Sequence, residues 1–252
     1  MARKKIVIAN WKNYPTTKRD ALKLFGAAKK SAARARGVTT IICPPAIFLP
    51  LFSARGKILL GSQNVSGETT GAHTGELSAS MLSPFRVTYV IVGHSERRAL
   101  GEDEAVVAKK VRRALAEGIR PVLCIGEAKR DTQGAYHEFL RQEIRSALIG
   151  LSSAEVKRVL IAYEPIWAIG KSAADAMKPG EVHETVIFIR KTLTEIVDRS
   201  TTERVPILYG GSVELDNVVS LYTYGDVDGF LVGHASTDAK IFDEMLGSIS
   251  NA

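Results

Sequence analysis

Short apolar runs and longer amphipathic runs alternate along the whole chain. The apolar runs are rich in β-branched residues and are apolar at consecutive positions, which is typical of strands buried on both faces of a parallel sheet. They predict strands at Lys5–Asn10, Val38–Cys43, Ile58–Asn64, Tyr89–His94, Pro121–Gly126, Val159–Glu164, Val205–Gly210 and Val227–Gly233.

The amphipathic segments between these runs predict helices at Asp20–Arg36, Asp103–Glu117, Phe139–Ile149, Glu181–Val197 and Asp238–Leu246. The first three are each followed by a glycine, which favours the left-handed conformation that ends many helices. Strands and helices that alternate in this way favour a closed (β/α)8 barrel over an open doubly wound sheet. We therefore predict the α/β class and a single (β/α)8 barrel domain over residues 1–252.

Length and composition agree with one globular domain. The 252 residues are near the usual size of such a barrel, and no linker divides them. The two cysteines, Cys43 and Cys124, are too few for a disulfide-stabilised secreted scaffold. The apolar run Ile6–Ala9 is too short for the core of a signal peptide, and no apolar stretch has the length of a membrane span. These features predict a cytoplasmic protein without a membrane partner.

The net charge of +7 has two interpretations. A basic surface is typical of nucleic-acid binding, but it is also common in proteins that bind none. Here the basic residues are spread over the predicted helix faces, without interleaved aromatic residues or a nucleic-acid-binding motif. We therefore predict no nucleic-acid partner, although the positive field can favour anionic substrates.

Polar residues stand at the C-terminal ends of three predicted strands. Asn10 is the last residue of the first predicted strand, and Lys12 follows it by two positions. His94 is the last residue of the fourth predicted strand, and Glu164 is the last residue of the sixth. In a (β/α)8 barrel these ends meet on one face, where the active sites of such enzymes lie. An ammonium, an imidazole and a carboxylate together are suited to moving a proton on an anionic carbonyl compound.

Each of these residues alone has a plainer interpretation. Lys12 could be a solvated surface charge, His94 part of a helix cap, and Glu164 a carboxylate at a helix start. The positive end of a helix would, however, keep His94 neutral and able to donate a hydrogen bond to a carbonyl. Glu164 follows an apolar strand and stands near Trp167, so partial desolvation would make it a better base.

Glycine-rich turns follow the last strands. Gly170 lies after the sixth, Tyr209–Val213 includes Gly210 and Gly211, and Leu231–Ser236 includes Gly233. Barrels often bind phosphate in the loops after the seventh and eighth strands, where glycine lets backbone N–H groups approach an anion. Simple tight turns are the alternative interpretation.

Other ligand-binding patterns are missing from the sequence. The histidines show no metal-ligand spacing with cysteines or carboxylates, and no Gly-x-Gly-x-x-Gly follows the first strand. We predict no metal and no cofactor. The long polar segment Ser62–Pro84 is either a contact loop or a flexible insertion.

The motifs taken together resemble the triosephosphate isomerase family. The matching segments are collinear and cover nearly the whole chain: Asn10-Trp11-Lys12, Gln63-Asn64-Val65, Gly93–Arg98, Cys124-Ile125-Gly126-Glu127, Tyr163–Gly170, Tyr209–Val213 and Asp228–Gly233. This family supplies both the name of the TIM barrel and a well-known case of proton transfer. The resemblance implies interconversion of D-glyceraldehyde 3-phosphate and dihydroxyacetone phosphate through an enediol, a step of glycolysis and gluconeogenesis.

The resemblance also implies a role for each candidate residue. Glu164 would be the base, neutral His94 would polarise the carbonyl, and Lys12 and Asn10 would stabilise oxyanion charge. The phosphate would be held by backbone N–H groups of Gly170, Ser212, Gly233 and His234. Two supporting residues complete the set: Glu96, which pairs with Lys12, and Cys124, which packs behind Glu164.

The resemblance further implies a mobile lid over residues 165–173 and a homodimer formed through Ser62–Pro84. Two departures from the family pattern stand out: Lys171-Ser172-Ala173 in the lid, and His234 where the family has a second glycine. Two alternatives remain open. One is another phosphosugar isomerase or lyase on the same barrel, whose loops could share the phosphate site. The other is a barrel that has lost catalysis and serves as a binding scaffold, which the two departures support.

Overall fold

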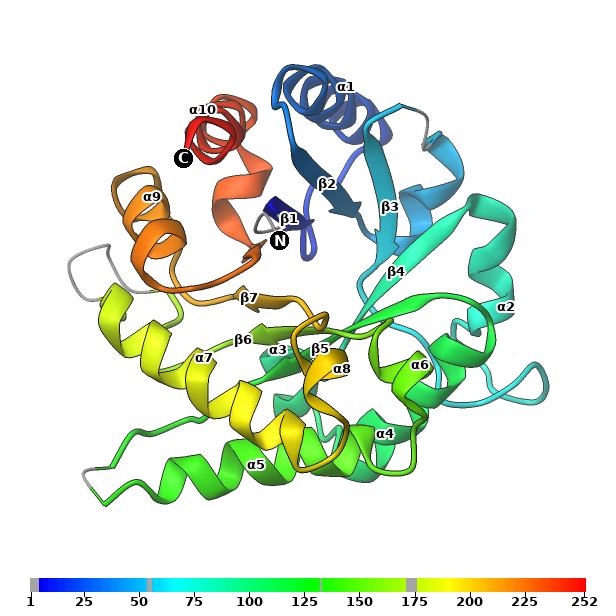
Figure 1. Ribbon diagram of the computed structural model, residues 1–252. Coiled ribbons are helices and arrows are strands. Elements are labelled where there is room, and N and C mark those ends of the chain that lie inside the picture. Colours follow the sequence, from blue (N-terminus) through cyan, green and yellow to red (C-terminus); the bar gives the residue numbers. More distant parts are fainter. Residues whose placement is uncertain (1–4, 54–55, 132, 171–175) are drawn as a thin grey trace.

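A computed structural model describes residues 5–53, 56–131, 133–170 and 176–252 (Figure 1). All strands are parallel and lie in chain order around a closed barrel, in which β1 pairs with both β2 and β8. The strands are β1 (Lys5–Asn10), β2 (Val38–Cys43), β3 (Ile58–Ser62), β4 (Val87–Val92), β5 (Arg120–Ile125), β6 (Leu160–Tyr163), β7 (Ile207–Tyr209) and β8 (Gly229–Val232). The predicted (β/α)8 barrel is confirmed.

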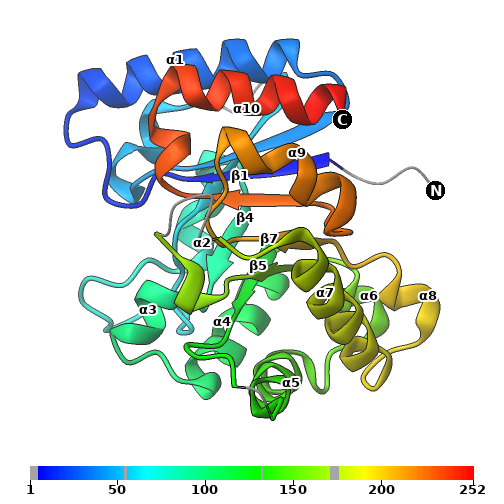
Figure 2. The same ribbon diagram turned by 90° about the vertical axis from the view of Figure 1, so that its left-hand side faces the viewer.

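Helices surround the barrel on its outer side, and α1 and α10 lie side by side where the chain closes on itself (Figures 1 and 2). The α-helices are α1 (Lys18–Arg34), α2 (Ala79–Leu82), α3 (Ser95–Ala99), α4 (Glu104–Ala116), α5 (Ala135–Leu148), α6 (Ser153–Val156), α7 (Pro179–Thr194), α8 (Arg199–Thr202), α9 (Leu215–Tyr224) and α10 (Ala239–Asn251). Short 3-10 helices lie at η1 (Ala46–Leu51), η2 (Ser83–Phe85), η3 (Ile166–Ala168) and η4 (His234–Thr237).

Two apolar layers explain why the strand segments are apolar at consecutive positions. In β1, Ile6 and Ile8 belong to the cluster inside the barrel, whereas Val7 and Ala9 belong to the cluster between the strands and the helices. Successive side chains of a strand point to opposite faces, so a strand that is covered on both faces must be apolar at every position.

The predicted elements differ from the observed ones mainly at their ends. β3 ends two residues earlier than predicted, where the chain turns into the long loop, and β6, β7 and β8 are shorter than predicted at both ends. β4 begins and ends two residues earlier than predicted. The helix α9 was not predicted, since its segment contains valine, threonine, serine and tyrosine, which are weaker helix formers than alanine or leucine. The backbone N–H of Glu214 donates to Asn217 Oδ1 at 2.9 Å and helps to begin this helix.

The long loop of residues 62–84 projects from the barrel between β3 and β4 (Figure 1). Its arms meet where the N–H of Ser66 donates to the carbonyl of Leu77 at 2.8 Å. Residues 69–76, beyond this point, are all exposed, so the loop presents a free tip.

Candidate active site

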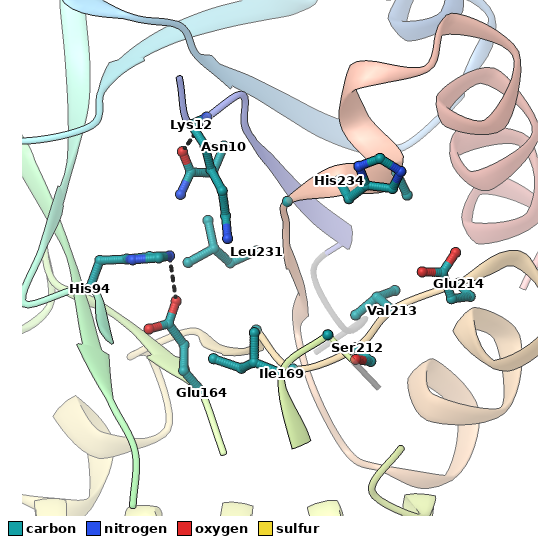
Figure 3. Close-up of a pocket in the computed structure, with 15 residues that line it drawn as sticks. Asn10, Lys12, His94, Glu164, Ile169, Ser212, Val213, Glu214, Leu231 and His234 are labelled. Carbon is teal, nitrogen blue, oxygen red and sulfur yellow. Dashed lines mark hydrogen bonds and ion pairs between the residues drawn. The ribbon is translucent and has the colours of Figure 1, made fainter. Parts of the chain in front are cut away.

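A cavity of about 440 Å³ opens at the C-terminal ends of the strands (Figure 3). The residues that line it include all of the predicted catalytic and substrate-binding residues: Asn10, Lys12, His94, Glu164, Gly170, Ser212, Gly233 and His234. These residues come from five separate strand ends, and only the closure of the barrel brings them together.

Lys12 projects into this cavity from a constrained turn after β1 (Figure 3). Its φ of 49° is in the left-handed region, which is uncommon for a residue other than glycine. Two hydrogen bonds hold the turn: Asn10 Oδ1 accepts from the N–H of Lys12 at 3.0 Å, and Gln63 Nε2 donates to its carbonyl at 2.7 Å. The ammonium group contacts Glu96 Oε1 at 2.6 Å.

His94 lies at the end of β4 and caps α3. Its Nδ1 accepts a hydrogen bond from the N–H of Glu96 at 3.2 Å, which assigns the ring proton to Nε2. The Nε2 atom lies 3.3 Å from Glu164 Oε1. The cap and the candidate catalytic group are therefore the same side chain: capping holds the imidazole in the neutral tautomer that can donate from Nε2.

Glu164 is buried at the end of β6, with 2% of its surface exposed. The N–H of Ser95 donates to its Oε2 at 3.1 Å, and His94 faces its Oε1. A Cβ atom on Gly210 would lie 2.9 Å from Glu164 Cγ, so a glycine at that position leaves room for the carboxylate.

The two predicted supporting residues lie outside this cavity. Glu96 lines a neighbouring cavity of about 620 Å³ and reaches the site through its contact with Lys12. Cys124 is buried inside the barrel. Burial and the nearby charge of Glu164 raise the pKa of the Cys124 thiol well above its ordinary value, so the thiol stays protonated.

The opposite wall of the cavity carries several glycines. Gly210, Gly211 and Gly233 lie along the loops after β7 and β8. A Cβ atom on Gly233 would come within 3.2 Å of Lys12 Cε, so this glycine leaves room for the lysine. His234 is exposed and lies at the rim, on the same side as Glu214 (Figure 3).

The start of the predicted lid packs on two other loops. Trp167 Nε1 and Tyr163 Oη both donate to Glu127 Oε1 at 2.9 Å, and Ser212 Oγ donates to the carbonyl of Ala168 at 2.9 Å. The motif Lys171-Ser172-Ala173 lies outside the described residues. The part played by Glu127 was not predicted, although Glu127 belongs to one of the motifs that carry the family resemblance.

Within the described residues, no group of three or more histidine, cysteine, aspartate or glutamate side chains is placed to hold a metal ion. In the same part of the chain, no helix is long and apolar enough to cross a membrane.

The fold and the site together are those of a (β/α)8-barrel enzyme. The family model described as triosephosphate isomerase matches residues 5–249, and the chain belongs to this family. A triosephosphate isomerase of Cupriavidus pinatubonensis is 42% identical over 247 residues, which cover 95% of this chain and 97% of the relative. One from Roseiflexus sp. is 40% identical over 245 residues and 94% of each chain, and one from Symbiobacterium thermophilum is 38% identical over 254 residues, 98% of this chain and 97% of the relative.

Proposed function

We propose that this protein interconverts D-glyceraldehyde 3-phosphate and dihydroxyacetone phosphate, an aldose–ketose isomerisation of glycolysis and gluconeogenesis. The observation that carries the proposal is the contact between His94 Nε2 and the buried Glu164 Oε1, in the cavity into which Lys12 projects. Family membership and the names of the relatives support the same reaction.

Glu164 acts as the base in the proposed mechanism. Its carboxylate removes a proton from the carbon next to the carbonyl and returns it to the neighbouring carbon, so that the intermediate is an enediol or enediolate. Burial shields this carboxylate from water, and the Ser95 N–H orients it. No cofactor takes part, because the proton leaves from and returns to the same substrate.

His94 and Lys12 act on the substrate oxygens. The Nε2–H of His94 donates to the carbonyl oxygen and shuttles protons between the two oxygens of the intermediate, while Nδ1 stays occupied by the Glu96 N–H. The Lys12 ammonium and the Asn10 amide stabilise the negative charge that develops on oxygen, as positioned charges do at other active sites. Glu96 holds the ammonium at the cavity through its contact with Lys12.

The phosphate group lies against the glycine-rich wall. Backbone N–H groups of Gly170, Ser212, Gly233 and His234 are proposed to hold it, since glycine permits close approach of an anion to the backbone. Closure of the lid would then exclude water from the enediol phosphate and suppress loss of phosphate.

A coupled assay that follows dihydroxyacetone phosphate formed from D-glyceraldehyde 3-phosphate tests the function. Rapid turnover that Glu164→Gln removes is the expected result. A different phosphosugar isomerase or a lyase would leave this substrate unchanged or cleave it, which phosphorus NMR detects. A binding scaffold would bind inorganic phosphate or substrate without turnover.

We further propose a homodimer in which the tip of the 62–84 loop enters the partner next to Lys12. By resemblance, Thr74 reaches the partner's Asn10 and Lys12, and Glu76 pairs with the partner's Arg97.

The cavity of about 620 Å³ beside Lys12 offers space for such a tip. Ile47 in η1 and Leu100 after α3 are exposed at 79% and 76%, as apolar side chains that a partner covers would be. Light scattering at micromolar protein should give twice the mass of one chain, and a monomer with full activity would contradict the proposal.

The compartment we propose is the cytoplasm. Cys43 and Cys124 are both free and buried, which suits a reducing compartment. Cell fractionation with an antibody against the protein tests this assignment.

A further inference from the structure

A buried charged pair lies directly behind the proton-transfer residues, and the proposed mechanism does not use it. Arg98 of α3 and Glu143 of α5 meet with 3.2 Å between Arg98 Nη2 and Glu143 Oε1. Only 14% of the Arg98 side chain and 1% of the Glu143 side chain are exposed. Charges as deeply buried as these require several partners, and here some of the partners are backbone groups of the active-site strands.

Arg98 holds the end of β4. Its Nε donates to the carbonyl of Gly93 at 2.8 Å, and its Nη2 donates to the carbonyl of Cys124 at 3.4 Å. Gly93, whose φ is 71°, immediately precedes His94, and a Cβ atom on it would lie 3.2 Å from Arg98 Nη2. The guanidinium therefore occupies the space beside the residue that sets the direction of His94. The Glu104 carboxylate accepts a hydrogen bond from Arg98 Nη1 and, together with Glu143, balances the charge of the guanidinium group.

Glu143 holds the end of β5. Its Oε2 accepts from the N–H of Gly126 at 2.8 Å. Gly126 packs against the backbone of Glu164 so closely that a Cβ atom on it would lie 1.8 Å from the Glu164 carbonyl oxygen. The N–H of Glu164 also donates to the carbonyl of Ile125 at 2.8 Å. A shift of Gly126 must therefore shift Glu164.

We propose that the Arg98–Glu143 pair is a positioning device that sets the distance between His94 Nε2 and the Glu164 carboxylate. One member acts through the carbonyl of Gly93 and the other through the N–H of Gly126, so the ion pair joins the backbone supports of the imidazole and the base. The inference rests on the proposed function, because the distance matters only if these two groups transfer protons. Both residues act through their neighbours and touch no substrate.

Two variants with nearly conserved shape test this role. Glu143→Gln keeps the side-chain volume, but its amide oxygen can face either the Gly126 N–H or the Arg98 guanidinium, and its NH2 group then faces the other donor. Arg98→Lys keeps the charge, but a single ammonium group cannot make all the contacts of the guanidinium group. These contacts reach the carbonyls of Gly93 and Cys124 and the carboxylates of Glu104 and Glu143. Misplacement of reacting groups by about 1 Å can cost on the order of 100-fold in rate. We expect each variant to lower kcat about tenfold to 100-fold.

The control is Arg190→Lys in α7, near the N-terminal ends of β7 and β8. Arg190 donates to the carbonyls of Thr202 and Val205 at 2.8 and 3.0 Å and contacts Asp228 at 3.3 Å, so it also joins backbone to a carboxylate, but far from the cavity. Arg190→Lys should lower stability without changing kcat. In the two test variants, KM and the inhibition constant of inorganic phosphate should stay within about twofold of the wild type, since the glycine-rich wall is untouched.

A purely structural pair would give the opposite pattern. If Glu143→Gln and Arg98→Lys lose stability but keep kcat within about twofold of the wild type, the inference is wrong. If Arg98→Lys does not fold, Glu143→Gln decides alone.

A second measurement, the imidazole nitrogen-15 shifts of His94, does not depend on turnover. These shifts should change in the test variants and remain unchanged in Arg190→Lys, and unchanged shifts in all variants would overturn the inference. Absence of isomerase activity in the wild type would refute the proposed function instead, and these shifts would still test the positioning.

Discussion

The two walls of the cavity are built in different ways. The wall formed after β1, β4 and β6 carries ionisable side chains, Lys12, His94 and Glu164, each held by at least one short contact. The wall formed after β7 and β8 carries three glycines, Gly210, Gly211 and Gly233, with the side chains of Glu214 and His234 beside them. The first wall, here called the side-chain wall, depends on residue identity, and the second, the backbone wall, depends on the path of the chain.

The difference between the two walls predicts which substitutions will change activity. A proton transfer needs one particular group at one particular distance, so a change of a single atom on the side-chain wall removes function. An anion held by N–H groups needs only that the backbone can approach it, so a side chain that points away from the anion is tolerated.

Glu164→Gln should lower kcat about 1,000-fold or more, because the amide cannot accept the substrate proton and general-base catalysis contributes roughly 100-fold to 10,000-fold. Glu164→Asp should keep a larger residual rate, with a loss on the order of 100-fold, because the base is retained but displaced by about 1 Å. The isomerase assay on folded protein measures both. Near-normal turnover in either variant would remove Glu164 from the role of base.

The support beneath the side-chain wall should make stability depend on pH. Burial raises the pKa of Glu143 above its ordinary value, against the opposing effects of Arg98 and the Gly126 N–H. Below the ordinary value, Glu143 is neutral in both folded and unfolded chains. Above it, the unfolded chain loses this proton more readily than the folded chain, so stability falls as pH rises until the folded carboxyl group also ionises and pairs with Arg98.

The charges of Arg98, Glu104 and Glu164 act on this carboxyl group. Urea unfolding of the wild type and Glu143→Gln from pH 5 to 8 measures the effect. The wild type should lose more stability than the variant over this range, and parallel pH dependences would show that Glu143 titrates normally.

Gly210→Ala links the two walls. The added Cβ atom would lie 2.9 Å from Glu164 Cγ, which is too close, so the base must move. We expect kcat to fall about tenfold, since the carboxylate remains present but displaced. Gly180→Ala in α7 is the matched control, because nothing lies within 4 Å of the added atom. Equal activities of the two variants would mean that Glu164 tolerates the displacement.

His234→Gly should have the smallest effect, with kcat/KM within about threefold of the wild type. The side chain is exposed at the rim, and the proposed contact with phosphate uses only the backbone N–H. Steady-state kinetics with D-glyceraldehyde 3-phosphate measures the change. A loss greater than tenfold would show that the imidazole itself contacts the substrate and that the backbone wall is more specific than proposed.

The barrel and the membership of the side-chain wall could be predicted from the sequence because both depend on local signals. Runs of β-branched and apolar residues such as Val38–Cys43 indicate strands covered on both faces, and this prediction agrees with β2 residue for residue. Lys12, His94 and Glu164 follow such runs, and parallel strands in a closed barrel must present their C-terminal ends on one face. The helix α9 was missed because its residues have weak helix propensity and its amphipathic packing on the barrel is a tertiary contribution.

The closed parallel architecture, the family and the set of residues gathered at the barrel mouth can all be inferred from local sequence patterns. How those residues meet depends on the folded chain as a whole: the capped tautomer of His94, its 3.3 Å approach to Glu164, and the support of Gly126 by Glu143 from α5. Apolar patterns and strand ends are properties of neighbouring residues, whereas these contacts join separate elements of the chain. Their distances follow from how the strands close and how the helices pack on them, and no local pattern encodes that geometry.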